Sequence, residues 1–129
     1  MNRFRYSSQR LALPDFCPKE LMKCIQELIY LEKGWISDKK GYALYIRPTH
    51  IATTVNSIKK ALIGVKPTHE SKIFVILTPT GSYYETGFSP ISLFVENHSI
   101  RAAPYGTGCY KIGGFNQNNI EIMLQPSTK

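Results

Sequence analysis

The sequence predicts an α+β fold from three observations. One segment has the apolar spacing of a helix, several short β-rich segments follow it, and the composition is typical of a globular protein. The chain has 129 residues, a length that suits one domain. Hydrophobic residues make up 43% and charged residues 19%, which favours a globular chain over a disordered one.

The segment from Pro18 to Lys33 has the pattern of an amphipathic helix. Pro18 suits the first helical position, Glu20 favours the positive end, and Lys33 followed by Gly34 favours the stop. The apolar residues at three- and four-residue spacing are Leu21, Ile25, Leu28 and Ile29. This stripe predicts a face that packs on the rest of the protein.

Three segments have the composition of β-strands. The first is Tyr42–Arg47, which we expect Pro48 to stop, and the second is Lys72–Leu77, which we expect Thr78 and Pro79 to stop. The third is Ile91–Val95. The residues between the second and third segments, 78–90, are rich in proline and glycine and are the best candidate for a domain boundary.

Charge and residue usage exclude several classes of protein. The net charge is +7, but the basic residues are scattered, so we expect a solvated basic face and no nucleic-acid partner. The longest apolar run, Ile73–Leu77, is too short for a bilayer, so we expect no membrane partner. The odd number of cysteines, 3, argues against a disulfide framework. His50, His69 and His98 lack metal-ligand spacing, which predicts surface or loop positions and no metal.

A glycine-rich loop surrounds one lysine. Between Pro104 and Gly114, four glycines flank Lys111. Glycines permit positive φ and close backbone approach, so the loop suits tight packing against another group. The segment lacks the order of a phosphate-binding Walker loop, because no Ser or Thr follows the lysine. By itself the pattern leaves a plain glycine turn as an equal alternative.

A succession of short motifs resembles the branched-chain amino acid aminotransferases, which are class IV pyridoxal-phosphate enzymes. Each block is modest, but their joint order over most of the chain is specific. The blocks are RLALPDF (10–16), CIQ (24–26), LYIRPT (44–49), IGVKPT (63–68), FVILTPTGSYY (74–84), FSPISL (88–93), IRA (100–102) and GTGCYKIGG (106–114).

The resemblance implies a fragment of the two-domain fold type IV aminotransferase. Residues 1–80 would be the last part of the small domain, 81–90 the interdomain connection, 91–114 the start of the large cofactor-binding domain, and 115–129 a divergent tail. Family members are longer. The resemblance therefore places a further phosphate-binding arginine, and the acidic partner of the pyridine nitrogen, outside this chain.

The resemblance assigns the cofactor residues. Lys111 matches the lysine that forms a Schiff base with pyridoxal 5′-phosphate, and Arg101 matches an arginine on the phosphate side of that cofactor. A primary amine can carry out both tasks of the lysine, bonding to the aldehyde and moving a proton at the substrate Cα. The planar fork of an arginine suits phosphate oxygens.

Tyr45 and Arg47 alternate along the first strand, so they share one face. In the resembled family they line the substrate side, where the arginine helps to accept the distal carboxylate of glutamate or 2-oxoglutarate. Ile63, Gly64 and Val65 resemble a substrate-binding loop that reaches into the pocket of the neighbouring subunit, which implies a homodimer in the complete protein. An apparent insertion at 56–60 precedes this loop.

Two departures affect the expected chemistry. Phe115 follows the glycines where the family has Asn and then a Tyr that donates to the cofactor ring oxygen, and Cys109 replaces a common acidic residue. We therefore expect amino transfer from leucine, isoleucine or valine to 2-oxoglutarate in the complete relative, and negligible activity with weak cofactor binding in this chain alone.

Two alternatives remain open beside this function. One is another class IV activity, D-amino acid transamination or aminodeoxychorismate cleavage. The other is a non-catalytic remnant that acts only as a subunit-interaction module. The basic start of the chain, with Arg3, Arg5 and Arg10, weakly resembles a transit peptide, but the family resemblance already reaches Arg10. We expect a cytoplasmic protein, with a mitochondrial location as the alternative.

Overall fold

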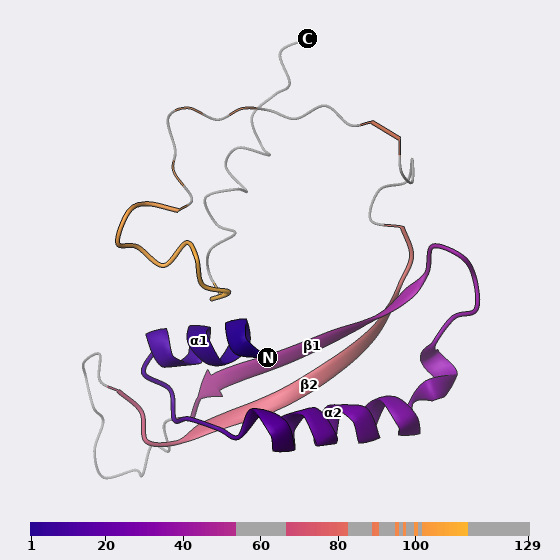
Figure 1. Cartoon of the computed structure of the whole chain (residues 1–129), viewed down its shortest axis with the longest axis horizontal. Coiled ribbons are helices and arrows are strands. Elements are labelled where there is room, and N and C mark those ends of the chain that lie inside the picture. The colour runs from indigo at the N-terminus through magenta and orange to yellow at the C-terminus, as the bar shows by residue number, and fades with distance from the viewer. Residues whose placement is uncertain are drawn as a thin grey trace. The chain divides into compact units, whose positions relative to one another are not determined.

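The computed structural model describes residues 1–53, 67–82, 89–90, 95, 97, 100 and 102–113. Its elements are, in order, α1 (Asn2–Arg10), α2 (Pro18–Leu31), the 3₁₀ turn η1 (Lys33–Trp35), β1 (Ala43–Ala52) and β2 (Ser71–Thr80) (Figure 1). The chain divides into two compact units, Met1–Ser89 and Pro90–Lys129, which are described separately. The first unit contains all of these elements and is of the α+β class.

Helix α2 confirms the predicted amphipathic segment. Cys17 caps it in an extended conformation, Pro18 occupies the first turn, and Glu20 lies there as well, so the start has the expected signals. The apolar stripe is the least exposed side of the helix, and Ile25 at its centre is buried. The helix ends at Leu31, and the chain continues into η1.

Helix α1 is not among the predicted elements. It has no acidic residue in its first turn and no side-chain cap, so the usual sequence signals of a helix start are missing. Its end turns at Leu11 and Ala12, and Ala12 has a left-handed φ of 52°. The guanidinium of Arg5 donates to both carboxylate oxygens of Asp15, with 2.8 Å between Nε and Oδ1, and this pair ties α1 to the segment that follows it.

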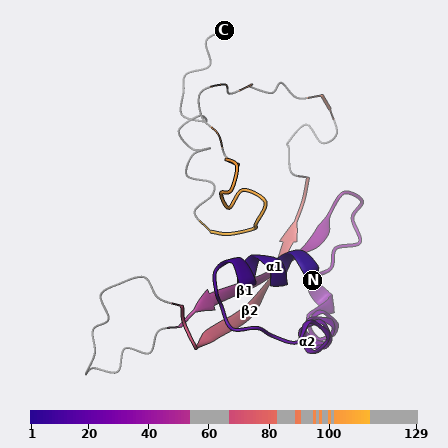
Figure 2. The same ribbon diagram turned by 60° about the vertical axis from the view of Figure 1, so that its left-hand side comes forward.

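Strands β1 and β2 form an antiparallel pair in the register Ala43↔Thr80 to Ala52↔Ser71 (Figures 1 and 2). Both strands are longer than predicted, and both run through the prolines that were expected to stop them. The prediction that Pro48 and Pro79 end strands is therefore wrong.

The register explains why both prolines are tolerated. The Thr53 N–H donates to the Glu70 carbonyl at 3.0 Å, just beyond the Ala52↔Ser71 pair. Backbone groups in an antiparallel pair face the partner strand at every second residue, so the odd-numbered residues of β1 bond to β2. Pro48 and Pro79 both fall in the alternate, non-bonded pairs. A missing N–H at such a position removes no ladder hydrogen bond.

The two faces of the sheet differ. On the helix side, Val75 and Leu77 of β2 lie with Leu28 of α2 and Trp35 of η1 around a hollow of about 240 Å³. His50 of β1 lies on the same face, against α1. The opposite face carries exposed Tyr45, Ile51 and Ile76 and is here called the open face.

In the second unit, residues 102–113 form successive turns. Of the third strand candidate, residues 91–94 lie outside the described residues, and Val95 is 83% exposed and lies in no strand. In the part of the chain that the structure describes, no helix has the length and apolar character needed to cross a membrane. The assignment of ranges to small domain, connection and large domain stays a prediction.

Candidate functional site

The open face brings together two of the residues predicted to contact substrate. Tyr45 and Arg47 are both exposed on this face of β1, and their cross-strand neighbours are Thr78 and Ile76. The guanidinium carbon of Arg47 lies 4.7 Å from the centroid of the Tyr45 ring. At this distance the guanidinium is attracted to the ring by a cation–π interaction, which holds it on the open face.

The charge of Arg47 is not neutralised by an ion pair with any described residue. The ion pairs of the described ranges lie elsewhere: Arg5 of α1 is paired with Asp15 of the segment that follows this helix, and Lys23 is paired with Glu20 within α2. Exposed Ile76 and Phe74 continue the open face along β2 beside Arg47. A positively charged fork beside apolar surface suits a ligand that has both a carboxylate and an aliphatic part.

Lys111 lies at the end of a run of turns. The Gly106 N–H donates to the Ala103 carbonyl and the Tyr110 N–H to the Thr107 carbonyl, both at 3.0 Å. The Lys111 side chain is exposed, and Gly113 just after it has open space where a Cβ would stand. Lys111 is thus an exposed residue at the end of these turns.

The glycines before Lys111 are required by close contacts. A Cβ on Gly108 would collide with the Cα and Cβ of Ala102, and one on Gly106 would lie 3.0 Å from the Ala103 carbonyl oxygen. Tyr105, directly before Gly106, has a left-handed φ of 61°. The close contacts at Gly106 and Gly108 are made by Ala102 and Ala103 of the loop itself, whereas the sequence predicted packing against another group.

Four predicted site residues lie outside the described residues. These are Arg101, Ile63, Gly64 and Val65. The same holds for the 56–60 insertion and for Phe115. Lys111 belongs to one unit and Tyr45 and Arg47 to the other.

One polar cluster on the helix side was missed from the sequence. We call Phe4, Ser8, Phe16 and His50 the His50 cluster. Ser8 is only 4% exposed, and its Oγ lies 2.9 Å from Nδ1 of His50. The prediction of a surface or loop position is wrong for His50, which is half-buried in β1, whereas His69 is exposed as expected. The alternation of β1 beyond Pro48 is the signal that was overlooked, since it places His50 on the covered face.

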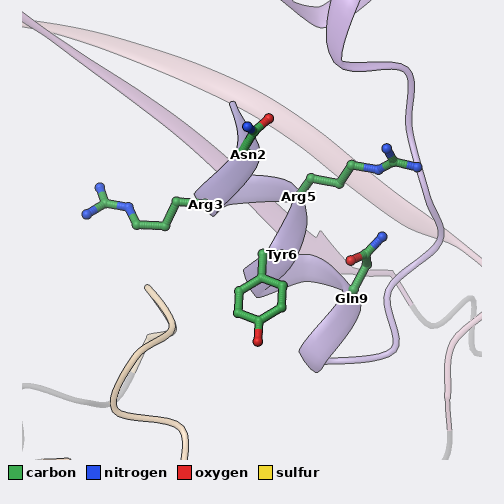
Figure 3. Close-up of a pocket in the computed structure, with 5 residues that line it drawn as sticks. All are labelled: Asn2, Arg3, Arg5, Tyr6 and Gln9. Carbon is green, nitrogen blue, oxygen red and sulfur yellow. The ribbon is translucent and has the colours of Figure 1, made fainter.

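The other surface features are less suited to binding a ligand or a metal ion. A shallow hollow of about 450 Å³ is lined by Asn2, Arg3, Arg5, Tyr6 and Gln9 of α1. Arg3 and Arg5 point to opposite sides of this helix (Figure 3), so their charges do not converge on one ligand. Within the described ranges, no group of His, Cys, Asp or Glu side chains is placed to hold a metal ion.

Comparison with known proteins identifies relatives of the whole chain. No family model matches the sequence. The chain is 47% identical to a branched-chain-amino-acid aminotransferase of Monosiga brevicollis over 116 residues, which is 90% of this chain and 28% of the relative. It is 42% identical to the branched-chain-amino-acid aminotransferase of Dictyostelium discoideum over 129 residues, which is 100% of this chain and 32% of that protein. The cytosolic branched-chain-amino-acid aminotransferase of Caenorhabditis elegans is 41% identical over 113 residues, 88% of this chain and 26% of the relative.

These identities extend over most of the chain and agree on one kind of protein, as the order of motifs from 10 to 114 predicted. The chain spans about 30% of the length of the curated relatives that it matches. It therefore belongs to the family of branched-chain-amino-acid aminotransferases, as a homologue of a segment of its members.

Proposed function

We propose that this chain is the part of a pyridoxal-phosphate-dependent branched-chain amino acid transaminase that carries the cofactor lysine, Lys111, and the substrate-facing pair Tyr45 and Arg47. The observation that carries the proposal is the 47% identity over 90% of the chain to a protein of that name. The open face and the exposed lysine support it independently. The proposed complete protein has the fold type IV architecture, acts on leucine, isoleucine or valine with 2-oxoglutarate, and is a homodimer.

The described residues fit the cofactor at the lysine. Pyridoxal phosphate needs a primary amine that its aldehyde can reach, and Lys111 is an exposed residue. Arg101, the proposed phosphate partner, lies outside the described residues. When bound, the cofactor supplies the aldehyde and the electron-accepting ring that the amino transfer requires.

The chain's own residues would bind the cofactor, orient the substrate and move a proton. Nζ of Lys111 would hold the cofactor and, once the substrate amine has taken its place, accept a proton from the substrate Cα. The N–H groups of Arg47 would bind the distal carboxylate of glutamate or 2-oxoglutarate, and the ring of Tyr45 would hold the guanidinium in place. Exposed Ile76 would offer apolar contact to a branched side chain.

The chain alone lacks about 70% of the length of its relatives, so we propose that it has negligible activity and at most weak cofactor binding by itself. Its location is proposed as cytoplasmic. The names of curated relatives specify the cytosol in some cases and the mitochondrion in others.

A chimera tests the function. The segment of the Dictyostelium discoideum protein that matches this chain is replaced by residues 1–129, and leucine transamination with 2-oxoglutarate is measured. We expect turnover, its loss in Lys111→Ala, and little change in Lys19→Ala, which alters an exposed lysine of α2. Activity confined to D-alanine would reject the branched-chain assignment. Borohydride trapping of pyridoxal phosphate on the 129-residue chain, followed by peptide mass mapping, shows whether the adduct forms at Lys111. Adducts spread evenly over many lysines would favour the non-catalytic alternative.

A further inference from the structure

The His50 cluster joins α1 to β1 through one chain of hydrogen bonds. The hydroxyl of Ser8 donates to the Phe4 carbonyl at 3.1 Å, and Ser8 Oγ lies 2.9 Å from Nδ1 of His50. Two aromatic rings enclose the imidazole. Phe16 meets it edge-on at 5.6 Å between centroids, and Phe4 lies at 6.2 Å. Polar and aromatic contacts therefore hold α1 at this one position of the sheet.

The hydrogen-bond pattern assigns the tautomer of His50. A serine hydroxyl has one hydrogen, and that of Ser8 is given to Phe4. The second contact of Ser8 Oγ must then be accepted from an N–H, so Nδ1 of His50 carries the proton. Nε2 is buried without a hydrogen-bond partner. The imidazole is therefore hydrogen-bonded on its Nδ1 side only, and a second proton at Nε2 would have no acceptor.

We propose that the His50 cluster is a pH-sensitive clasp, which keeps α1 on the sheet while the imidazole of His50 is neutral and releases α1 when that ring is protonated. Protonation at Nε2 creates a buried, charged N–H that faces no acceptor. A buried charge without a partner is strongly disfavoured, whereas the same imidazolium is solvated once α1 moves away.

The surrounding charges do not counteract this effect. Helix α1 contains no acidic residue, and its last turn carries Arg10. The titratable groups at the junction of α1 and the following segment are Arg5, Asp15 and Cys17, and the first two are paired with each other. Across the sheet, His50 is paired with apolar Ile73. Burial alone lowers the pKa of His50 from its ordinary 6.5, with no charged group among the causes.

The direction of the pH effect follows from this lowered pKa. The state with α1 released keeps a free imidazole that binds a proton near pH 6.5, and the closed state binds it only at lower pH. The closed state is therefore fully favoured above pH 6.5 and loses its advantage as the pH falls below it. The equilibrium constant for release of α1 rises by up to about tenfold for each pH unit below 6.5, until His50 is protonated in the closed state as well.

Hydrogen exchange of the 129-residue chain tests the clasp. Protection of the α1 amides is measured relative to the α2 amides between pH 7.5 and 5, with correction for intrinsic exchange rates. We expect the α1 protection to fall roughly tenfold in the wild type. We expect no such fall in His50→Phe, which keeps a ring in the aromatic enclosure but cannot be protonated. The matched control His69→Asn removes an exposed histidine and should behave as the wild type does.

A measurement without any variant covers the case in which His50→Phe fails to fold. Imidazole ¹⁵N shifts of the wild type should show the Nδ1–H tautomer of His50 and a titration below that of His69. A pH-independent α1, an equal fall in His50→Phe, or an Nε2–H tautomer with an ordinary pKa would each overturn the clasp.

Discussion

Ile25 is the one buried residue of α2, and its truncation to alanine should destabilise the first unit strongly. Ile25 is 6% exposed at the centre of the apolar stripe of α2. The change removes three carbons, at about 0.8 kcal/mol each for burial, and adds a term for the cavity that remains. Together these lower the free energy of unfolding by about 2–4 kcal/mol, a large fraction of the stability of a small domain.

Urea denaturation followed by tryptophan fluorescence measures this loss. Trp35 is the one tryptophan of the sequence, and it lines the hollow between α2 and β2, so its emission reports the contact under study. Met22→Ala is the matched control, because Met22 lies on the same helix and is 40% exposed. We expect it to change the free energy of unfolding by less than about 1 kcal/mol. If Ile25→Ala has no larger effect than Met22→Ala, α2 does not pack on the sheet through its apolar stripe.

Two further perturbations test the loop of Lys111 and the anchor of α1. Gly108→Ala should displace the amide chemical shifts throughout residues 102–113, because the new Cβ collides with Ala102. The new Cβ of Gly113→Ala meets nothing within 4 Å, so this control should shift only the amides next to it. Equal effects of the two changes would contradict the loop conformation. The hydrogen bond from Arg5 lowers the pKa of Asp15 below its ordinary 3.8, so the stabilisation by this pair is complete above pH 3.8 and lost as the pH falls through the lowered value. Acid unfolding monitored by circular dichroism should show this loss in the wild type but not in Asp15→Asn, which lacks the contribution at every pH.

The local sequence pattern was sufficient to predict the family, helix α2 and the shared face of Tyr45 and Arg47. The helix follows from residues within one segment, namely the cap, the proline at its start and the apolar spacing. The shared face follows from the two-residue period of any strand, whatever its partner is. The contact of the Arg47 guanidinium with the Tyr45 ring could not be predicted in this way, since the period places the side chains on a face but does not fix their rotamers.

Properties that depend on a partner segment were decided only by the tertiary structure. Pro48 and Pro79 looked like strand ends, yet each lies inside a strand, because the register between β1 and β2 turns the missing N–H away from the ladder. Helix α1 lacks local start signals and is held instead by contacts with Asp15 and His50, which lie 10 and 42 residues away in sequence from Arg5 and Ser8. The sequence by itself therefore determined the family and the local elements. The strand limits, α1 and the environment of His50 depend on which residues distant in sequence meet, and no local pattern contains that information.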